Sequence, residues 1–355
     1  MPFFNTDNHY ILIHLYIHYM INPHLSFLIE YAEKHKNEIN ETKESFINRY
    51  IQTCNNQRSS NTSYETKDNK ILYIEPTNIC NSSCIFCPRH KITREKGYMD
   101  LKLYEKILID ASVSGVKYIR LFLYGEPTLH PHLATMIKMA KSKGFIVDTN
   151  SNAISLNEKL SHEIILSGLD SIVFSVDSIV PEVYENMRIG GNLKNVLNNI
   201  SIFKSIRNNM NKESPHITIQ TMETTATCNE NSISFFYPYA DSINLSSLSN
   251  RNNTIEGLDK LQITKSLAHA STCFFLGQGL SIYWNGDATV CCGDYNGEYI
   301  LGNITNKSIN ELLDSPILHH IKESIKSNNL KHLPLCNTCE SDTSYNVPIN
   351  YLVAK

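Results

Sequence analysis

The stretch Cys80-Asn-Ser-Ser-Cys84-Ile-Phe-Cys87 places three thiols within eight positions, directly after the apolar run Ile71–Glu75. Three thiolates cannot complete a tetrahedral structural zinc site, which takes four ligands. On a 4Fe-4S cluster, three thiolates leave one iron without a protein ligand. The spacing therefore predicts a metal centre with an open position, on a loop that follows a strand. Incidental or zinc-binding cysteines are the alternative.

Outward from this loop, apolar runs typical of strands alternate with amphipathic stretches typical of helices. The expected strands are Ile71–Glu75, Tyr118–Leu123, Phe145–Thr149, Ser171–Val176, Ile217–Met222 and Ser242–Leu245. The expected helices between them are Leu101–Ser114, Leu133–Lys143, Asn157–Ser167 and Leu193–Arg207. This alternation predicts an α/β fold with a parallel sheet, a partial (β/α)6 TIM-like barrel. In such folds the chemistry occurs at the carboxyl ends of the strands.

The chain is expected to have three parts. Residues 1–70 are expected to form a helical extension and a polar linker, and residues 71–250 the barrel. Residues 251–355 are expected to form a small α+β domain, because Leu280–Cys291 has the pattern of a hairpin with Asn285-Gly286 in its turn. Two short helices are expected after the hairpin, at Ile309–Asp314 and Ile317–Lys326.

Composition limits the partners that the chain is expected to bind. Of 355 residues, 41% are hydrophobic, which is enough for a substantial core. Lys and Arg number 32 against 35 for Asp and Glu, a net charge of −3, so we expect no nucleic-acid or membrane partner. The apolar segment Tyr10–Ile21 contains His14 and His18 and is too short to span a bilayer. With no signal-peptide pattern, we expect a cytoplasmic location, where clustered cysteines favour metal binding over disulfides.

Short polar sets follow consecutive predicted strands. Tyr124-Gly125-Glu126-Pro127 follows the second strand, Thr149-Asn150-Ser151-Asn152 ends the third, and Ser175-Val176-Asp177 ends the fourth. Together with the cysteine spacing and Phe86 before the last cysteine, these sets resemble the radical S-adenosylmethionine superfamily over about Ile71–Leu245. The second set is similar to the GGEP motif of that family, with a tyrosine in place of its first glycine.

The resemblance implies a radical enzyme. It implies that Cys80, Cys84 and Cys87 hold a 4Fe-4S cluster whose open iron is chelated by S-adenosylmethionine, the source of a 5′-deoxyadenosyl radical. A glycine allows close backbone approach, and the Glu126 carboxylate suits the ammonium of the methionine moiety. The residues implied to contact the cofactor are Phe86, Gly125, Glu126, Asn150, Ser175, Asp177 and Arg188. For Arg188, a solvated surface arginine is the alternative.

A second cysteine set follows the barrel. It consists of Cys273, Cys291, Cys336 and Cys339. With Gly286 in a turn before Cys291, the set resembles the auxiliary-cluster region of the SPASM and Twitch subgroup, and four cysteines suffice for one auxiliary 4Fe-4S cluster. Cys292 is the alternative to Cys291, and structural zinc is the alternative to the cluster. Cys54 and Cys228 lie outside both sets.

These features favour a radical enzyme that oxidises a small polar metabolite, such as an alcohol carbon of a sugar or aminocyclitol. Glu223, just after the fifth strand, and Tyr124 are the candidate catalytic residues, as substrate contacts or a general base. A peptide- or protein-modifying maturase is the second hypothesis, and a non-catalytic iron-sulfur or zinc-binding scaffold is the third. The expected partners are a small-molecule substrate or a precursor peptide and, from the resemblance, a flavodoxin or ferredoxin-type reductant.

Overall fold

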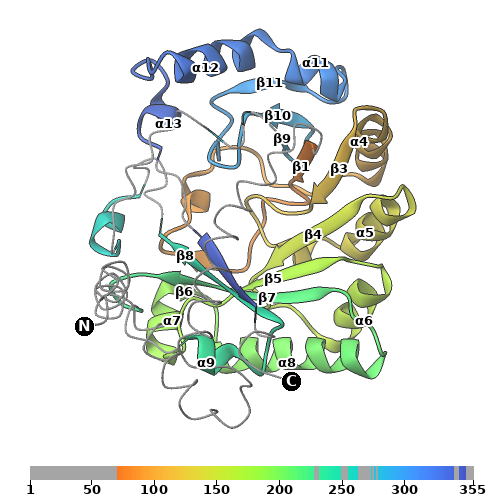
Figure 1. Cartoon of the computed structure of the whole chain (residues 1–355), viewed down its shortest axis with the longest axis vertical. Coiled ribbons are helices and arrows are strands. Elements are labelled where there is room, and N and C mark those ends of the chain that lie inside the picture. The colour runs from red at the N-terminus through yellow and green to blue at the C-terminus, as the bar shows by residue number, and fades with distance from the viewer. Residues whose placement is uncertain are drawn as a thin grey trace, which may run out of the picture.

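One sheet of ten strands organises the described part of the chain (Figure 1). The computed structural model describes residues 70–227, 232–248, 255–262, 273, 276, 279–339 and 344–348. The parallel strands at its centre are β1 (Lys70–Ile74), β3 (Val116–Arg120), β4 (Ile146–Ser151), β5 (Ser171–Ser175), β7 (His216–Glu223) and β8 (Ser242–Ser247). The predicted α/β fold is confirmed, and each expected strand overlaps one of these. The expected N-terminal extension, with Cys54, and Cys228 lie outside the described residues.

Helices cover one face of the parallel strands. These are α4 (Leu101–Val113), α5 (Leu133–Ser142), α6 (Glu158–Leu166) and α8 (Leu193–Asn209), all at expected positions, and the short α7 (Pro181–Met187). Side chains alternate along the strands, so Ile119 and Val147 are fully buried in the core beneath the helices. Their neighbours Arg120 and Asp148 point to the other face and are partly exposed. We call this second, polar face the inner face of the sheet.

The second expected strand ends earlier than its apolar run. β3 ends at Arg120, although the run continues to Leu123. The amide of Leu121 still donates to the carbonyl of Asp148 at 2.8 Å, and the chain then leaves the sheet toward Gly125. The residues after Leu121 therefore lie beyond the carboxyl end of β3, on the side of the sheet where the site is expected.

Strands from the C-terminal part extend the sheet at both edges. β9 (Gly279–Ile282) pairs parallel with β1. β10 (Asp287–Thr289) pairs antiparallel with β9 to form the hairpin, and β11 (Ile300–Asn303) pairs antiparallel with β10. At the other edge, β12 (Ser344–Pro348) pairs antiparallel with β8. The expected hairpin and the two expected helices, α11 (Ile309–Leu313) and α12 (Pro316–Lys326), are confirmed. Because β9 is bonded to β1, the hairpin is fixed directly to the strand that precedes the three cysteines.

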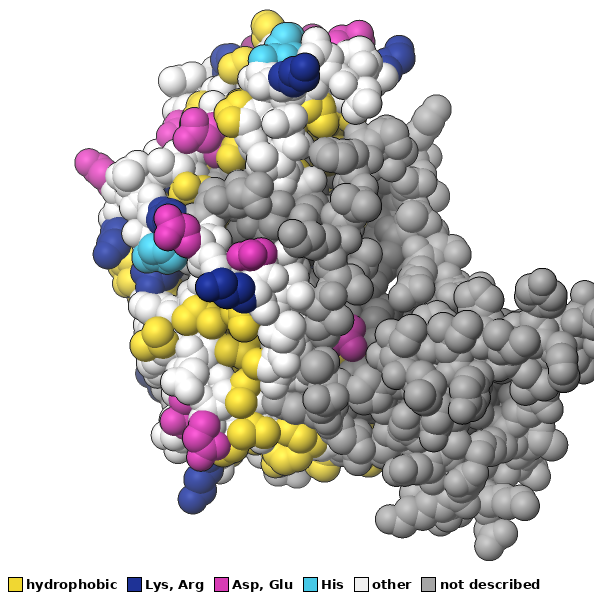
Figure 2. Space-filling view, turned by 90° about the vertical axis from the view of Figure 1, so that its left-hand side faces the viewer, with side chains coloured by type: hydrophobic (Ala, Val, Ile, Leu, Met, Phe, Trp, Pro, Cys, Tyr) yellow, Lys and Arg dark blue, Asp and Glu magenta, His cyan; other side chains and the backbone are white. Residues whose placement is uncertain are grey.

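On the described part of the face in Figure 2, acidic and basic side chains are interspersed, and apolar side chains gather in its lower half.

Within the described ranges, every helix falls short of the length or the apolarity that crossing a bilayer requires.

The turn of the hairpin generates a first prediction. Gly286 has a φ of +90°, and an added Cβ would lie 2.9 Å from Oδ1 of Asn303. Gly144 has a similar φ of +83° but no atom within 4 Å of an added Cβ. Gly144→Ala should cost about 1 to 2 kcal/mol for the backbone alone, and Gly286→Ala should cost more because it adds the contact. Thermal unfolding followed by circular dichroism measures both, and equal midpoints would contradict this assignment.

Candidate functional site

The first cysteine set lies on the loop that leaves the carboxyl end of β1, which we call the cysteine loop (residues 79–93). Cys84 belongs to the short strand β2 (Ser83–Cys84), and the amide of Cys87 donates to the carbonyl of Cys84 at 3.1 Å. The 3-10 helix η2 (Pro88–Lys91) follows. The three cysteines are half-buried and form no disulfide among the described residues, and burial raises the pKa of Cys80 to about 11. Such thiols ionise when a metal supplies compensating positive charge, so the loop suits metal ligation.

Arg188 is held beside this loop by strand pairing. It lies in β6 (Arg188–Ile189), which pairs antiparallel with β2 and places Arg188 opposite Cys84. Its Nε donates to Oδ2 of Asp177 at 2.6 Å, Nη1 lies 3.7 Å from the thiol of Cys84, and the guanidinium lies 5.2 Å from the centre of the Phe86 ring. Arg188 is only 8% exposed, so the surface alternative is wrong. Four residues predicted from three separate motifs, Cys84 and Phe86, Asp177, and Arg188, therefore meet in one cluster.

The loop after β3 is seated against the start of the cysteine loop. A Cβ at Gly125 would lie 2.0 Å from the carbonyl oxygen of Thr77, so no other residue fits without moving backbone. The amide of Glu126 donates to the carbonyl of Ile79 at 2.9 Å. The sequence predicted a glycine here for close backbone approach to a ligand. In the structure the group that requires the glycine is the backbone of Thr77, and approach to a ligand stays a prediction.

The carboxylate of Glu126 connects two strand ends. It is buried, and Oε1 accepts hydrogen bonds from the amide and hydroxyl of Thr128 and from the hydroxyl of Ser151. Oε2 accepts from the amide of Asn152 at 2.7 Å. This carboxylate therefore fixes the end of β4 to the loop after β3. Its contact with the ammonium of a ligand stays a prediction.

Asn152 is a site residue that the sequence analysis did not select. It is buried, and its side-chain nitrogen Nδ2 donates to Oδ1 of Asn81 at 2.8 Å. The same nitrogen lies 3.7 Å from the thiol of Cys80. The polar set that ends the third strand was the available signal. Which of its four members faces the cysteine loop depends on the turn after β4, which the sequence alone does not specify.

Two buried acceptors lack a protein donor. Oδ1 of Asn150, on the inner face of β4, and Oδ1 of Asp177, just beyond β5, are both buried without a hydrogen-bond partner among the described residues. Ser175, the last residue of β5, is half-buried on the same side of its strand as Asp177. A buried acceptor left unpaired costs about 1 to 3 kcal/mol. Both atoms therefore fit a ligand that brings hydroxyl or ammonium donors, as S-adenosylmethionine does.

The second cysteine set gathers beside the hairpin. Burial raises the pKa of Cys336 to about 12, and the nearby Cys273 and Cys339 raise it further. Burial also raises the pKa of Cys291, and the nearby Cys292 and Cys273 raise it further. Cys273 therefore lies near both Cys291 and Cys336, and Cys339 lies near Cys336. Among the described residues, no group of three or more His, Cys, Asp or Glu side chains is arranged to hold a metal ion, so the four-thiol cluster stays a prediction.

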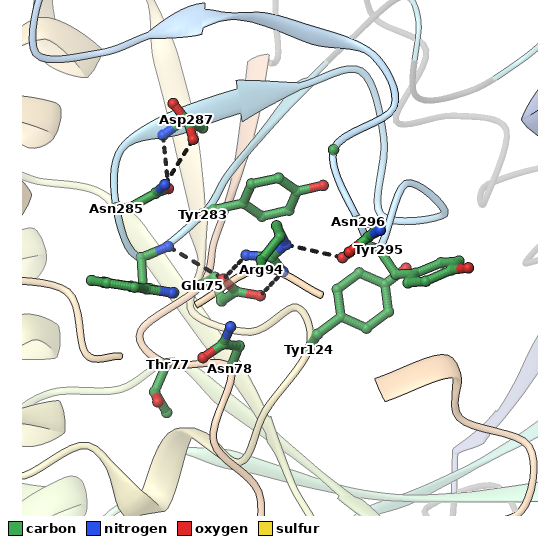
Figure 3. Close-up of polar contacts among 12 residues, drawn as sticks. Glu75, Thr77, Asn78, Arg94, Tyr124, Tyr283, Asn285, Asp287, Tyr295 and Asn296 are labelled. Atoms are coloured by element: carbon green, nitrogen blue, oxygen red, sulfur yellow. Dashed lines mark hydrogen bonds and ion pairs between the residues drawn. The ribbon is translucent and has the colours of Figure 1, made fainter. Parts of the chain in front are cut away.

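Cys292 lies on the side of the inner face. Burial raises the pKa of Tyr73 in β1, and Cys292 is one of the nearby groups that add to this shift. The hydroxyl of Tyr124 donates to the carbonyl oxygen of Cys292, and the Tyr124 ring lies 6.3 Å from that of Tyr295 (Figure 3). This placement favours Cys291 as the ligand. The same contacts bond Tyr124, a candidate catalytic residue, to the segment that follows Cys291.

Glu223, the other candidate catalytic residue, is the last residue of β7. It is half-buried and lies opposite Ser247 of β8. It therefore stands at the carboxyl edge of the parallel strands, where the sequence analysis placed it.

Asp294 shapes the segment of residues 291–299, which we call the auxiliary loop. Its side chain is fully buried, and Oδ1 accepts from the amides of Gly297 at 2.9 Å and Glu298 at 2.8 Å. Oδ2 accepts from the amide of Tyr299 at 2.9 Å and from the hydroxyl of Thr289. One carboxylate thus satisfies three backbone donors of the loop that contains Cys291.

Replacing this carboxylate should release the auxiliary loop. Asp294→Asn keeps the size but leaves a single acceptor oxygen, so at least one buried amide loses its partner. We expect reconstituted protein to bind about half the iron of the unchanged chain, because only the cluster of the cysteine loop remains. Asp287→Asn is the matched control, since the carboxylate of Asp287 accepts from the side chains of Asn285 and Asn303 and, among its described contacts, from no backbone amide. Full iron content in Asp294→Asn would contradict this role.

Two family models match the chain. The model of the radical SAM superfamily matches residues 74–225, and that of the SPASM iron-sulfur cluster-binding domain matches residues 273–340. The first range contains the cysteine loop and the strand ends through β7, and the second contains all four cysteines of the second set. Proteins of this kind use S-adenosylmethionine and 4Fe-4S clusters, one of them auxiliary.

Known proteins share parts of this chain. The crystal structure of BtrN in complex with AdoMet and 2-DOIA has a TM-score of 0.55 and 18% identity, covering 77% of this chain and 93% of that one. SuiB of Streptococcus suis, bound to the precursor peptide SuiA, has a TM-score of 0.59 and 14% identity, covering 80% and 72%. The cofactor-modifying protein of tungsten-containing aldehyde ferredoxin oxidoreductase from Pyrococcus furiosus is 34% identical over 122 residues. That match covers 34% of each chain, about a third of the relative's length.

The family models cover both cysteine sets, and the solved structures share the fold. The chain belongs to the radical S-adenosylmethionine superfamily and carries a C-terminal SPASM iron-sulfur cluster-binding domain.

Proposed function

We propose that this chain is a radical S-adenosylmethionine oxidoreductase that oxidises an alcohol carbon of a small polar metabolite, of the sugar or aminocyclitol type. The observation that carries the proposal is the polar inner face of the parallel sheet. This face is bordered at one edge by the cysteine loop and, through Tyr73 and Cys292, by the auxiliary loop.

The inner face offers paired charges, aromatic walls and unpaired acceptors. Nε of Arg120 donates to Asp148 at 3.0 Å, and its guanidinium lies 5.3 Å from the ring centre of Tyr73 and 5.0 Å from that of Phe122. The side chains of Arg120 and Asp148 remain 31% and 23% exposed. Oδ1 of Asn244, on β8, is buried without a partner among the described residues. Such a lining suits a ligand with several hydroxyl or amino groups.

Each cysteine set would hold one cluster. Cys80, Cys84 and Cys87 would hold the cluster to which S-adenosylmethionine binds, and Cys273, Cys291, Cys336 and Cys339 would hold the auxiliary cluster. When bound, these groups supply a 5′-deoxyadenosyl radical that removes a hydrogen atom from carbon, and an acceptor for a second electron. A flavodoxin or ferredoxin-type protein is the proposed source of the electron that each cleavage consumes.

The cofactor would lie across the carboxyl ends of β3 to β5. Arg188 is placed to bind its carboxylate, and the unpaired oxygens of Asn150 and Asp177 are placed to accept from its hydroxyl or ammonium groups. Phe86 and Ser175 would line the same site, and Gly125 with Glu126 would shape its wall.

The protein must also accept a proton. Oxidation of CH–OH to a carbonyl releases a hydrogen atom, an electron and the hydroxyl proton, and the last of these needs a base. Glu223, half-buried at the end of β7, is the proposed base. Tyr124 is the proposed positioning residue, because its hydroxyl is bonded to the carbonyl of Cys292.

Changing Arg188 tests the cofactor site. Arg188→Lys keeps the positive charge but loses the planar group that reaches both Asp177 and Cys84, so we expect S-adenosylmethionine to bind on the order of tenfold more weakly while iron content is unchanged. Binding is followed by the change that S-adenosylmethionine causes in the electron paramagnetic resonance signal of the reduced cluster. Arg207→Lys, at the end of α8, is the control for loss of a buried guanidinium. Unchanged affinity in Arg188→Lys would remove Arg188 from the site.

Deuterium transfer tests the function itself. Anaerobic, reduced protein is incubated with S-adenosylmethionine and with sugars, aminocyclitols or peptides deuterated at defined carbons. We expect deuterium in 5′-deoxyadenosine and a carbonyl product from one sugar or aminocyclitol. Transfer from a peptide alone would support a maturase instead, and transfer from none of these compounds would reject the proposed substrate class.

The auxiliary cluster is tested with the same substrate. In the double variant Cys336→Ala, Cys339→Ala, deuterium transfer should continue while the carbonyl product falls to background, because the second electron has no acceptor. Full product formation in this variant would exclude the auxiliary cluster from the reaction.

A further inference from the structure

Glu75 and Arg94 form a two-pronged ion pair at the base of the cysteine loop (Figure 3). Glu75 follows β1 and precedes the first cysteine, whereas Arg94 follows the last one. The Nη atoms of Arg94 donate to Oε2 of Glu75 at 3.0 Å and to Oε1 at 2.9 Å. The Glu75 side chain is 0% exposed and that of Arg94 is 12% exposed. Each charge thus depends on the other, because removing one would leave its partner uncompensated in the interior.

A second layer of contacts closes the same loop. The hydroxyl of Thr77 donates to the carbonyl of Gly97 at 2.6 Å. The side chain of Asn78 donates to the carbonyl of Glu95 at 2.8 Å and accepts from the amide of Gly97 at 3.1 Å. The two chain segments that enter and leave the cysteine loop are therefore held side by side over several residues.

The ion pair also contacts the auxiliary loop and the hairpin. Nε of Arg94 donates to the carbonyl of Tyr295 at 3.0 Å, and its guanidinium lies 3.6 Å from the centre of the Tyr283 ring. The carboxylate of Glu75 accepts from the amide of Trp284 at 3.3 Å. The same two side chains thus flank the cysteine loop and bond to the hairpin and to the auxiliary loop.

Neighbouring residues repeat this bridge. Thr93 donates its amide and its hydroxyl to Oδ1 of Asn296, at 2.8 and 3.0 Å. The indole of Trp284 donates to the carbonyl of Glu95 at 3.0 Å. The hydrogen bonds from residues 93–95 therefore run to the hairpin and the auxiliary loop on one side of the ion pair.

Another buried ion pair provides a comparison. Arg207 of α8 pairs with Asp241, whose Oδ2 accepts from the amide of Ile217 at 2.8 Å. This pair joins a helix end to the starts of β7 and β8 and touches no cysteine segment among its described contacts. Glu75 and Arg94 differ from it in the segments that they connect.

We infer that Glu75 and Arg94 are positioning residues that couple the cysteine loop to the auxiliary loop, so that order in one loop stabilises the other. The inference rests on the proposed assignment of one cluster to each cysteine set. It implies that the two clusters keep a fixed relative position, because one buried ion pair closes the base of the cysteine loop and bonds to the auxiliary loop. It also implies that loss of the cluster from one loop lowers the order of the other loop.

The test removes the first cluster in the presence and in the absence of the pair. Cys87→Ala should remove the cluster of the cysteine loop and raise amide hydrogen exchange in the auxiliary loop on the order of tenfold. In Arg94→Met, exchange in the auxiliary loop should already be raised, and adding Cys87→Ala should change it little, because coupled changes are not additive. Exchange is measured by mass spectrometry on whole protein purified without air.

Matched variants separate coupling from general destabilisation. Arg207→Met removes the guanidinium of the Arg207–Asp241 ion pair and should leave the full response of the auxiliary loop to Cys87→Ala. If Arg94→Met does not fold, Arg94→Lys takes its place in the test. Arg94→Lys keeps the charge without the two-pronged contact, so the change in exchange that Cys87→Ala causes in its auxiliary loop should be intermediate.

Two failures are distinguishable by iron analysis of each sample. An equal response to Cys87→Ala with and without Arg94, where the two parent proteins that keep Cys87 carry both clusters, would overturn the inference. Unchanged protein that binds no iron on the cysteine loop would instead reject the proposed function.

Discussion

A loop that carries three thiols and no disulfide has to be closed by something other than its thiols. Among the described residues no disulfide joins it, and burial, with a smaller contribution from Cys84, raises the pKa of Cys80. The buried ion pair of Glu75 and Arg94 closes the loop at its base, and the pairing of β2 with β6 closes it across Cys84. The rest of the site is arranged on these two closures, since Arg188 is brought in by β6 and the auxiliary loop by Arg94.

The sheet explains why the two cysteine sets lie together despite their separation in sequence. β9 pairs with β1 in parallel, so the hairpin starts beside the strand that leads to Glu75. Tyr124, on the loop after β3, then bonds to Cys292, and Glu126 fixes that loop to the end of β4. Successive strand ends thus contribute one contact each, and unpaired acceptors at Asn150 and Asp177 are left where a ligand would bring donors.

Local patterns in the sequence were sufficient for the strands, helices and motifs. Period-two alternation in runs such as Ser171–Val176 and turn residues such as Asn285-Gly286 act over a few residues, and the structure confirms them. The addition of β9 to β1 and of β12 to β8 was not predictable in this way, because it depends on pairings between residues far apart in the chain.

The same division applies to the site. The cysteines, Gly125 and Arg188 were selected from motifs, but the burial of Arg188 follows from β2–β6 pairing, which has no local signal. Glu126 was assigned to a ligand because its type suits an ammonium, and its bonds to Ser151 and Asn152 were not predicted. Glu75 and Arg94 carried no motif at all, since an ion pair across a loop is visible only once the loop is closed.

The central claim is that Cys80, Cys84 and Cys87 hold an iron-sulfur cluster with one iron free for S-adenosylmethionine. Electron paramagnetic resonance of the reduced Cys336→Ala, Cys339→Ala protein observes that cluster without the auxiliary one. The account predicts a 4Fe-4S signal that changes when S-adenosylmethionine is added. A protein without this signal, or with a signal that S-adenosylmethionine leaves unchanged, would contradict it.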